Sequence, residues 1–304
     1  MLNKKPQISI GIPAFNEQDN IKKLLKNVLN QKGNNFSIKE IIIVSDQSTD
    51  NTINEINSIG DKRIRVLENK KRLGQALSQN KILESFTGDV LILLNADIMP
   101  KSDFITNIIK PIINSDIDLV GAKVSPLPAK NFFESIINHS ASMKQNLYES
   151  VKKGQNIYMC HGRARAFSRR FAKKFKWQAV IGEDAYSYLS CIANGYKFQY
   201  CPEAEVLYRS PQSLKDHLKQ SVRFFQGKKH KNENFKLSFI INEYYVPLFK
   251  IVFTFLKYLI IDPVRMSSYI AIILYARMLS ELRKRTSSAW DVSASSKQLE
   301  LSGS

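Results

Sequence analysis

Hydrophobic positions in the first 125 residues follow two alternating periods. Short runs of apolar and β-branched residues are typical of buried strands, and they occur at residues 7–12, 40–44, 63–67 and 89–94. Between them, apolar residues have the spacing of amphipathic helices at residues 21–29, 53–56 and 73–86. Gly33 and Asn34 are expected to end the first helix. Strands that alternate with helices predict an α/β fold, with a mostly parallel sheet and helices on both faces.

Polar or turn-forming residues follow three of the predicted strands, at residues 13–17, 45–48 and 95–97. Ligands of such sheets bind at the carboxyl ends of the strands, so we expect these segments to meet at one edge. An aspartate after a strand also caps helices, but three such segments favour a ligand site. The chain contains neither GxGxxG nor GxxxxGK[ST], which excludes the usual dinucleotide fingerprint and the Walker phosphate loop.

Two apolar stretches lie towards the C-terminus, at residues 246–261 and 269–279. Neither is a run of about 20 uncharged residues, as a transmembrane helix requires. Lys250, Thr254 and Lys257 form one helical stripe on the first stretch. We therefore expect a helix that lies in the membrane interface, with its lysines snorkelling outward.

Asp262 and Pro263 separate the two stretches, and basic residues flank both ends of the segment. Basic flanks predict that both ends lie on the cytoplasmic side, so we expect the protein at the cytoplasmic face of the cell membrane. A helical hairpin that covers a second subunit is the alternative, and it would make the protein a homo-oligomer. The Ser-rich residues 287–304 are expected to be disordered.

The composition is typical of a folded protein with an anionic partner. Hydrophobic residues make up 43% of the 304 and charged residues 24%, which argues against a mostly disordered chain. The net charge of +18 indicates nucleic acid, anionic lipid or a phosphorylated substrate. We expect no nucleic acid, because neither a zinc-finger spacing nor a basic zipper occurs. Three cysteines without a CxxC pair form neither a disulfide framework nor a structural zinc site.

Several short motifs together resemble one enzyme family. This chain resembles the family 2 glycosyltransferases with the GT-A fold. The motifs that match the family's donor half are, in chain order, residues 12–17, 45–50, 72–74 and 95–97. Gly-Glu-Asp at 182–184 resembles the family's ED motif, and Gln-Ser-Val-Arg-Phe at 220–224 resembles its QxxRW motif. The resemblance implies an inverting enzyme that moves a sugar from a nucleotide sugar to a glycan or lipid-linked saccharide acceptor. UDP is the first choice for the nucleotide.

The resemblance also implies the donor-binding residues. They are Pro13, Ala14, Asn16, Glu17, Asp46, Ser48, Arg72, Gly74, Asn95 and Ala96. Asp46 matches the carboxylate that accepts the imide N–H of uracil. Asp97 matches the last residue of the family's DxD motif, which holds Mn²⁺ or Mg²⁺ against the departing diphosphate. Asn95 replaces the first aspartate of that motif, and the alternative role for Asp97 is a cap on the next helix.

The catalytic and acceptor-side residues follow from the later motifs. Asp184 is expected to act as general base on the acceptor hydroxyl. Adjacent helical positions do not share a face, so Glu183 would bond to backbone or acceptor instead. Gln220, Arg223 and Phe224 match QxxRW, with phenylalanine in place of tryptophan, and Arg223 is suited to a diphosphate. The alternative is that residues 182–184 only place negative charge at a helix N-terminus.

Arg163 is a further candidate for an anionic acceptor or a lipid pyrophosphate, with simple surface exposure as the alternative. Two other functions stay open: a polyprenyl-phosphate sugar synthase and a non-catalytic basic protein that binds membranes. The synthase's phosphate acceptor needs no base, so the ED and QxxR motifs count against it. Asp97, Asp184 and Arg223 count against a non-catalytic protein. The expected division is a donor half at 1–125, an acceptor and catalytic half at 126–234, membrane or oligomer helices at 235–286, and a tail at 287–304.

Overall fold

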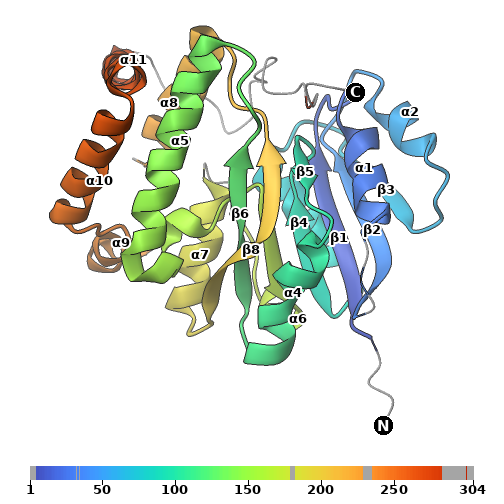
Figure 1. The fold of residues 1–304 in the computed structure, drawn as a ribbon. Coiled ribbons are helices and arrows are strands. Elements are labelled where there is room, and N and C mark those ends of the chain that lie inside the picture. The colour runs from blue at the N-terminus through green and yellow to red at the C-terminus, as the bar shows by residue number, and fades with distance from the viewer. Residues whose placement is uncertain are drawn as a thin grey trace.

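The computed structural model of the protein describes residues 5–31, 33, 35–178, 182–228, 235–282 and 299, with the backbone alone for 222–228 and 282. Two expectations fall outside these residues: the role of Asn34 in ending the first helix, and the disorder of the 287–304 tail apart from Leu299. Within the described residues, an eight-stranded sheet lies at the centre of the molecule with helices around it (Figure 1). This arrangement confirms the predicted α/β class.

Four parallel strands form the first half of the sheet, in the order β3-β2-β1-β4. They are β1 (Gln7–Ala14), β2 (Ser37–Ser45), β3 (Ile64–Glu68) and β4 (Val90–Leu94). Each overlaps a strand predicted from the sequence. Along β2, Ile41 and Ile43 join one hydrophobic cluster, whereas Ile42 and Val44 join another. Side chains alternate between the two faces of a strand, so this strand is apolar throughout because both faces are covered.

Helices cover both faces of this half-sheet, as predicted. The cluster on one face includes residues of α1 (Ile21–Leu29), α2 (Thr52–Asn57) and α4 (Phe104–Ser115). The cluster on the other face includes residues of α3 (Gln75–Ser85), α6 (Arg169–Ala172) and α7 (Glu183–Ala193). In α1, the buried residues Ile21, Leu24, Leu25 and Val28 follow the predicted stripe. The first half of the sheet thus has the architecture that the periodicity of residues 1–125 predicts.

The second half of the sheet is mixed rather than parallel. It contains β5 (Ile98–Pro100), β6 (Leu119–Pro126), β7 (Ala164–Ser168) and β8 (Phe198–Tyr208). Strand β7 lies antiparallel between β4 and β6, β8 pairs parallel with β6, and β5 pairs antiparallel with β8. Because β7 runs opposite to β4, the residues that lead into β7 lie beside the carboxyl end of β4. The reversed strand therefore brings a later segment of the chain to the predicted ligand edge.

The remaining helices lie along one side of the molecule (Figure 1). They are α5 (Phe132–Ser150), α8 (Leu214–Lys228), α9 (Leu237–Glu243), α10 (Leu248–Ile261) and α11 (Pro263–Leu282), with short 3₁₀ turns η1 (Val151–Gly154) and η2 (Ile157–Met159) after α5. The predicted break at Asp262-Pro263 is confirmed, and proline occupies the first position of α11, where its missing N–H costs nothing. A third hydrophobic cluster joins α10 and α11 to α5.

The structure decides which face of α10 meets the protein. Thr254 is 5% exposed and faces the protein, and the Nζ of Lys250 donates to the backbone carbonyl of Ser150 at the end of α5. Only Lys257 is exposed, as the prediction required. The last carbonyls of a helix have no partner within the helix, so the end of α5 draws the ammonium group inward. Several large apolar residues of α10, among them Phe249, Phe253 and Ile260, face outward.

Candidate active site

The first two predicted segments meet at the carboxyl edge of β1 and β2. The backbone N–H of Asn16 donates to the Oγ of Ser48 at 3.2 Å, and the N–H of Thr49 donates to the Oδ1 of Asn16 at 2.8 Å. The N–H of Glu17 donates to the Oγ1 of Thr52 at 2.8 Å. Asn16 adopts φ 52°, a left-handed conformation that asparagine tolerates better than most residues. The expected convergence of these segments is confirmed.

Asp46 joins this edge to the turn before α3. Its side chain is 5% exposed. Oδ1 accepts from Asn69 Nδ2 at 2.7 Å and from the Leu73 N–H at 2.8 Å, and Oδ2 accepts from the Gly74 N–H at 2.9 Å. Gly74 is the N-cap of α3 at φ 85°, where an L side chain would be strained. Asp46 therefore anchors the 72–74 motif, and its contact with a nucleobase stays a prediction.

Arg72 lies over the ring of Phe15, with 3.6 Å from its Cζ to the ring centroid. A guanidinium over an aromatic face is held by cation–π attraction. This contact brings Arg72 to the 13–17 segment, as a shared donor site requires. Phe15 was not among the expected site residues. The signal that could have found it is an aromatic residue between two expected ones, Ala14 and Asn16.

The third segment, 95–97, connects β4 to β5. Because a strand follows it rather than a helix, the alternative role of Asp97 as a helix cap is wrong. The Oδ1 of Asn95 accepts from Gln75 Nε2 at 2.9 Å, and the Asn95 N–H donates to the carbonyl of Arg163 at 2.9 Å. Residues 95–97 thus lie between α3 and the segment that leads into β7. The predicted convergence extends to this segment.

Asp97 provides one half-buried carboxylate at this edge. Among the described residues, no three His, Cys, Asp or Glu side chains gather as a metal site would require. A single carboxylate still suits Mn²⁺ or Mg²⁺, because Mg²⁺ in particular keeps several waters and takes its other ligands from substrate phosphates. The chemistry of the site therefore fits a divalent cation that arrives with a diphosphate.

Glu183 and Asp184 form the first turn of α7, after Gly182 at φ 89°. Glu183 is 8% exposed and Asp184 is half-buried. A Cβ added at Gly162 would lie 2.6 Å from the Oε1 of Glu183 and 3.5 Å from the Cβ of Asp184. The backbone at Gly162 therefore lies directly against both acidic residues. Through Arg163, the same segment is bonded to Asn95, so residues 160–163 connect the metal-candidate turn with the ED motif.

Arg165 is the most buried charged group near this site, at 0% exposed on β7. Its Nη1 donates to the carbonyl of Glu183 at 3.3 Å and to Ser187 Oγ at 2.7 Å. Trp177 Nε1 donates to the same Glu183 carbonyl at 2.8 Å. Among the described residues, Arg165 forms no ion pair with a carboxylate. Its guanidinium therefore holds the first turn of α7 in place. This role differs from both alternatives for the arginines of the 161–167 segment, which were an anionic acceptor and surface exposure.

His161 is a second residue that the sequence reasoning missed. Burial and the positive charge of Arg163 lower the pKa of His161 to about 4, and the negative charge of Asp184 opposes that shift. The imidazole is therefore neutral at pH 7 and lies within electrostatic range of the candidate base. Arg163 itself lies over the ring of Tyr208, at 4.0 Å from the centroid, rather than extending freely into solvent. The His-Gly-Arg triplet before β7 was the available signal.

The QxxR motif lies on α8, so Gln220 and Arg223 are three residues apart on one helix. Gln220 is half-buried. The side chains of Arg223 and Phe224 lie outside the described residues. Their contacts with a diphosphate or an acceptor stay predictions.

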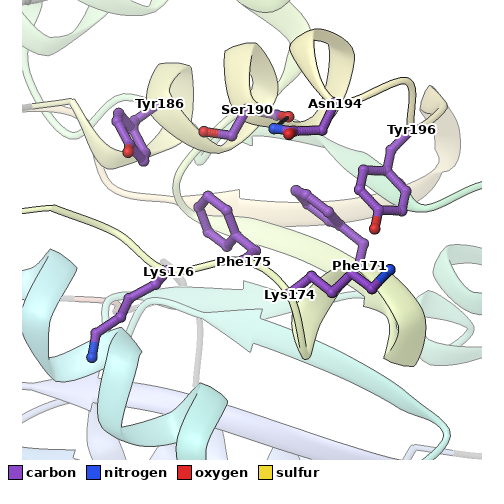
Figure 2. Close-up of a pocket in the computed structure, with 8 residues that line it drawn as sticks. All are labelled: Phe171, Lys174, Phe175, Lys176, Tyr186, Ser190, Asn194 and Tyr196. Atoms are coloured by element: carbon purple, nitrogen blue, oxygen red, sulfur yellow. Dashed lines mark hydrogen bonds between the residues drawn. The ribbon is translucent and has the colours of Figure 1, made fainter. Parts of the chain in front are cut away.

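A cavity of about 420 Å³ lies elsewhere, between α7 and the residues that follow β7 (Figure 2). Aromatic rings line it, including Phe171, Phe175, Tyr186 and Tyr196. None of its lining residues belongs to the predicted site. Lys176 points away from the other lining side chains in Figure 2 and forms an ion pair with Glu84 at 3.2 Å. This cavity is therefore separate from the edge where residues 13–17, 45–48 and 95–97 meet.

The fold and the edge described above define a glycosyltransferase with the GT-A fold. Residues 9–175, more than half of the chain, match Glycosyl transferase family 2, and the chain belongs to that family. Solved structures that share the fold include the following two. Mannosyltransferase PcManGT from Pyrobaculum calidifontis, in complex with GDP-Man and Mn²⁺, has a TM-score of 0.59 and 16% identity, covering 94% of this chain and 78% of its own. TarS 1–349 of S. aureus with UDP-GlcNAc has a TM-score of 0.55 and 14% identity, covering 80% and 69%.

Curated relatives are similar over most of the chain. An uncharacterized glycosyltransferase of Haemophilus influenzae is 25% identical over 260 residues, which are 75% of this chain and 73% of the relative. A relative in Methanococcus voltae is 25% identical over 73% of this chain and 72% of its own. It is a dolichyl N-acetyl-alpha-D-glucosaminyl phosphate 3-beta-D-2,3-diacetamido-2,3-dideoxy-beta-D-glucuronosyltransferase. The poly-beta-1,6-N-acetyl-D-glucosamine synthase of Staphylococcus aureus is 27% identical over 74% of this chain and 57% of its own.

Proposed function

We propose that the protein is an inverting glycosyltransferase that moves a sugar from a nucleotide donor, UDP-linked as the first choice, to a hydroxyl of a glycan or lipid-linked saccharide. One observation carries the proposal: the backbone of residues 160–163 bonds to Asn95 on one side and lies against Glu183 and Asp184 on the other. A leaving-group site and a base site must be neighbours for transfer in one displacement. The pairing of β7 with β4 supports this proximity.

The donor would bind along the edge formed by residues 13–17, 46–48, 72–74 and 95–97. Solved structures of the same fold contain UDP, UDP-GlcNAc or GDP-Man, which supports a nucleotide sugar as the donor. The mutual hydrogen bonds of these segments make the edge rigid before the donor arrives, and a preorganised site loses less entropy on binding. Asp97 would hold a divalent cation, which supplies charge neutralisation for the departing diphosphate.

Transfer would take place in a single displacement. The acceptor oxygen forms a bond to the anomeric carbon as the bond from that carbon to the diphosphate oxygen breaks. The electron pair leaves with the diphosphate, and the hydroxyl proton passes to the carboxylate of Asp184. Attack from the face opposite the leaving group inverts the anomeric centre. Glu183, held between Gly162 and the anchored first turn of α7, would orient the acceptor or the neighbouring base.

The test uses the purified full chain and a panel of nucleotide sugars, with and without Mn²⁺. We expect one UDP-sugar to raise the melting temperature in the presence of metal. That donor should then release UDP faster when a saccharide acceptor is added, with the product in the inverted configuration by NMR. A panel in which no nucleotide sugar changes the melting temperature would refute the proposal. Transfer to a polyprenyl phosphate alone would favour the synthase instead.

A further inference from the structure

An unusual apolar surface covers the outer side of α9, α10 and the start of α11. We call it the α9–α11 surface. Its residues with large exposed fractions are Leu237 57%, Ile241 61%, Tyr245 65%, Leu248 72%, Phe249 70%, Phe253 71%, Ile260 81%, Ile261 61% and Val264 63%. Scattered exposed apolar residues are ordinary, but a contiguous patch of this kind marks a site of interaction. Figure 1 shows α10 at the outer side of α5, away from the sheet.

Helix α10 exposes large apolar side chains on its outer face. Phe255, Tyr258 and Leu259 pack against the cluster that joins α10 to α5, and Thr254 is the residue of α10 that is fully buried. Leu248, Phe249, Phe253 and Ile260 face outward instead. A helix that faced water would bury its apolar face and expose its lysines. This outer face is therefore suited to an apolar partner.

The segment lies along the protein and does not extend away from it. Within the described residues, Leu237–Ile261 is the one segment long and apolar enough to cross a membrane by length and composition. However, α9 ends at Glu243 and α10 begins after Pro247, so the segment bends. The Oε2 of Glu243 accepts from the hydroxyl of Tyr188 on α7 at 2.8 Å. This bond and the contact of Lys250 tie both halves to the folded domain.

Basic residues surround the α9–α11 surface. Lys152 and Lys153 are exposed on η1, two and three residues after the Ser150 carbonyl that Lys250 contacts. Both adopt left-handed backbone conformations, with φ of 48° and 53°, which cost energy for residues other than glycine. Lys236 and Lys257 are also exposed, before α9 and on α10. An apolar face with a basic rim matches the two layers of an anionic membrane, acyl chains and headgroups.

We propose that the α9–α11 surface docks on an anionic lipid membrane, with Phe249 and Phe253 at the acyl boundary and Lys152 and Lys153 at the headgroups. A second copy of the chain is the less favoured occupant, because each copy has a net charge of +18 and the basic rims would face one another. The prediction that the membrane contacts this segment is kept. The contact residues differ from those expected from the sequence.

Docking in this way would place the candidate base near the lipid, a consequence that rests on the proposed function. The hydroxyl of Tyr158 donates to the carbonyl of Tyr244 at 3.0 Å, and Cys160, two residues further on, donates from its Sγ to the carbonyl of Asp184 at 3.8 Å. Burial raises the pKa of Tyr244, and the negative charge of Asp184 adds to that shift. Tyr244 directly follows α9, and its neighbour Tyr245 is 65% exposed on the surface. The saccharide of a lipid-linked acceptor would therefore reach Asp184 from the membrane side. A docked enzyme would thus be suited to a lipid-linked acceptor.

The test is flotation with vesicles of phosphatidylcholine, with or without phosphatidylglycerol, at low and high salt. We expect the full chain to float with anionic vesicles about tenfold more than with neutral ones, and to be partly released by salt. Phe249→Asp/Phe253→Asp should lower the bound fraction by about tenfold, because charged groups are costly in the acyl region. Lys152→Gln/Lys153→Gln should remove most of the salt-sensitive part.

The matched control is Ile113→Asp, which changes an apolar residue of α4 that is 45% exposed and outside the surface, and it should float like the wild type. The phenylalanine variants should retain the melting-temperature shift with the nucleotide sugar, so that failure of docking is distinguishable from failure of donor binding. The proposal is overturned if the full chain stays soluble at low salt. It is also overturned if, without lipid, light scattering shows a dimer that the phenylalanine substitutions dissociate.

Discussion

A single methyl group at Gly162 should slow transfer while leaving the fold intact. A Cβ at this position would lie 2.6 Å from the Oε1 of Glu183, whereas ordinary contacts begin at 3.4 Å. The carboxylate of Glu183 must therefore retreat by about 0.8 Å. A displacement of about 1 Å in catalytic geometry can cost up to about 10²-fold. We expect Gly162→Ala to lower kcat by about 10- to 100-fold, a barrier increase of about 1.4 to 2.7 kcal/mol.

The stability of this variant should change by less than about 1 kcal/mol. The added Cβ meets the end of a flexible side chain rather than backbone, and alanine also reduces the entropy of the unfolded chain. Gly121→Ala is the contrasting control, because its Cβ would lie 2.3 Å from the backbone carbonyl of Met159. That substitution should lower the melting temperature clearly. Comparing the two separates a loss of catalysis from a loss of folding.

The assay measures UDP release with saturating acceptor and melting temperature on the same samples. The double variant Gly162→Ala/Glu183→Asp provides the strict test, since a shorter carboxylate leaves room for the methyl group. We expect it to be no slower than Glu183→Asp alone, because residues in contact do not contribute additively. Penalties that multiply in the double variant would refute the reasoning. So would an unchanged kcat in Gly162→Ala.

Four other predictions follow from the site and the fold. Asp184→Asn should lower kcat by about 10²–10⁴-fold with donor affinity nearly unchanged, and transfer at the wild-type rate would exclude Asp184 as the base. In calorimetry, donor affinity should increase with Mn²⁺ in the wild type and lose that dependence in Asp97→Ala; equal affinity with chelator and with metal in the wild type would contradict this. Arg165→Met should lower kcat more than it raises the donor KM. Arg165→Lys should restore part of kcat, because one hydrogen-bond donor to the Glu183 carbonyl returns. A loss confined to the melting temperature would show a purely structural role. Burial lowers the pKa of His217 from 6.5 to about 4, so between these two pH values the unfolded state binds a proton that the folded state does not. The free energy of unfolding therefore falls as the pH drops through that window. The loss between pH 7 and 5, measured by denaturant unfolding, should be about 2 kcal/mol and should be smaller in His217→Gln.

Local pattern in the sequence determined much of the donor half. The short apolar runs correctly placed β1 to β4, because strands covered on both faces are apolar throughout. The helical spacing correctly placed α1, because that helix buries the face that its apolar residues define. The polar ends of β1, β2 and β4 also followed from the sequence, since parallel strands direct their carboxyl ends to one edge. The resemblance of these segments to a family agrees with the match of residues 9–175. The individual roles given to the site residues stay predictions.

Tertiary structure alone decided what approaches that edge. Strand β7 pairs with β4 in reverse, and this pairing brings Gly162, Arg163 and Arg165 beside residues distant in the chain. No local period encodes the direction of a distant partner strand, so nothing in the sequence distinguishes Arg165 from a surface arginine. The same holds for α10, whose pattern defines a polar stripe and an apolar face without saying which one meets the protein. The carbonyl of Ser150 at the end of α5 accepts from Lys250, and only the packed chain brings these two groups together.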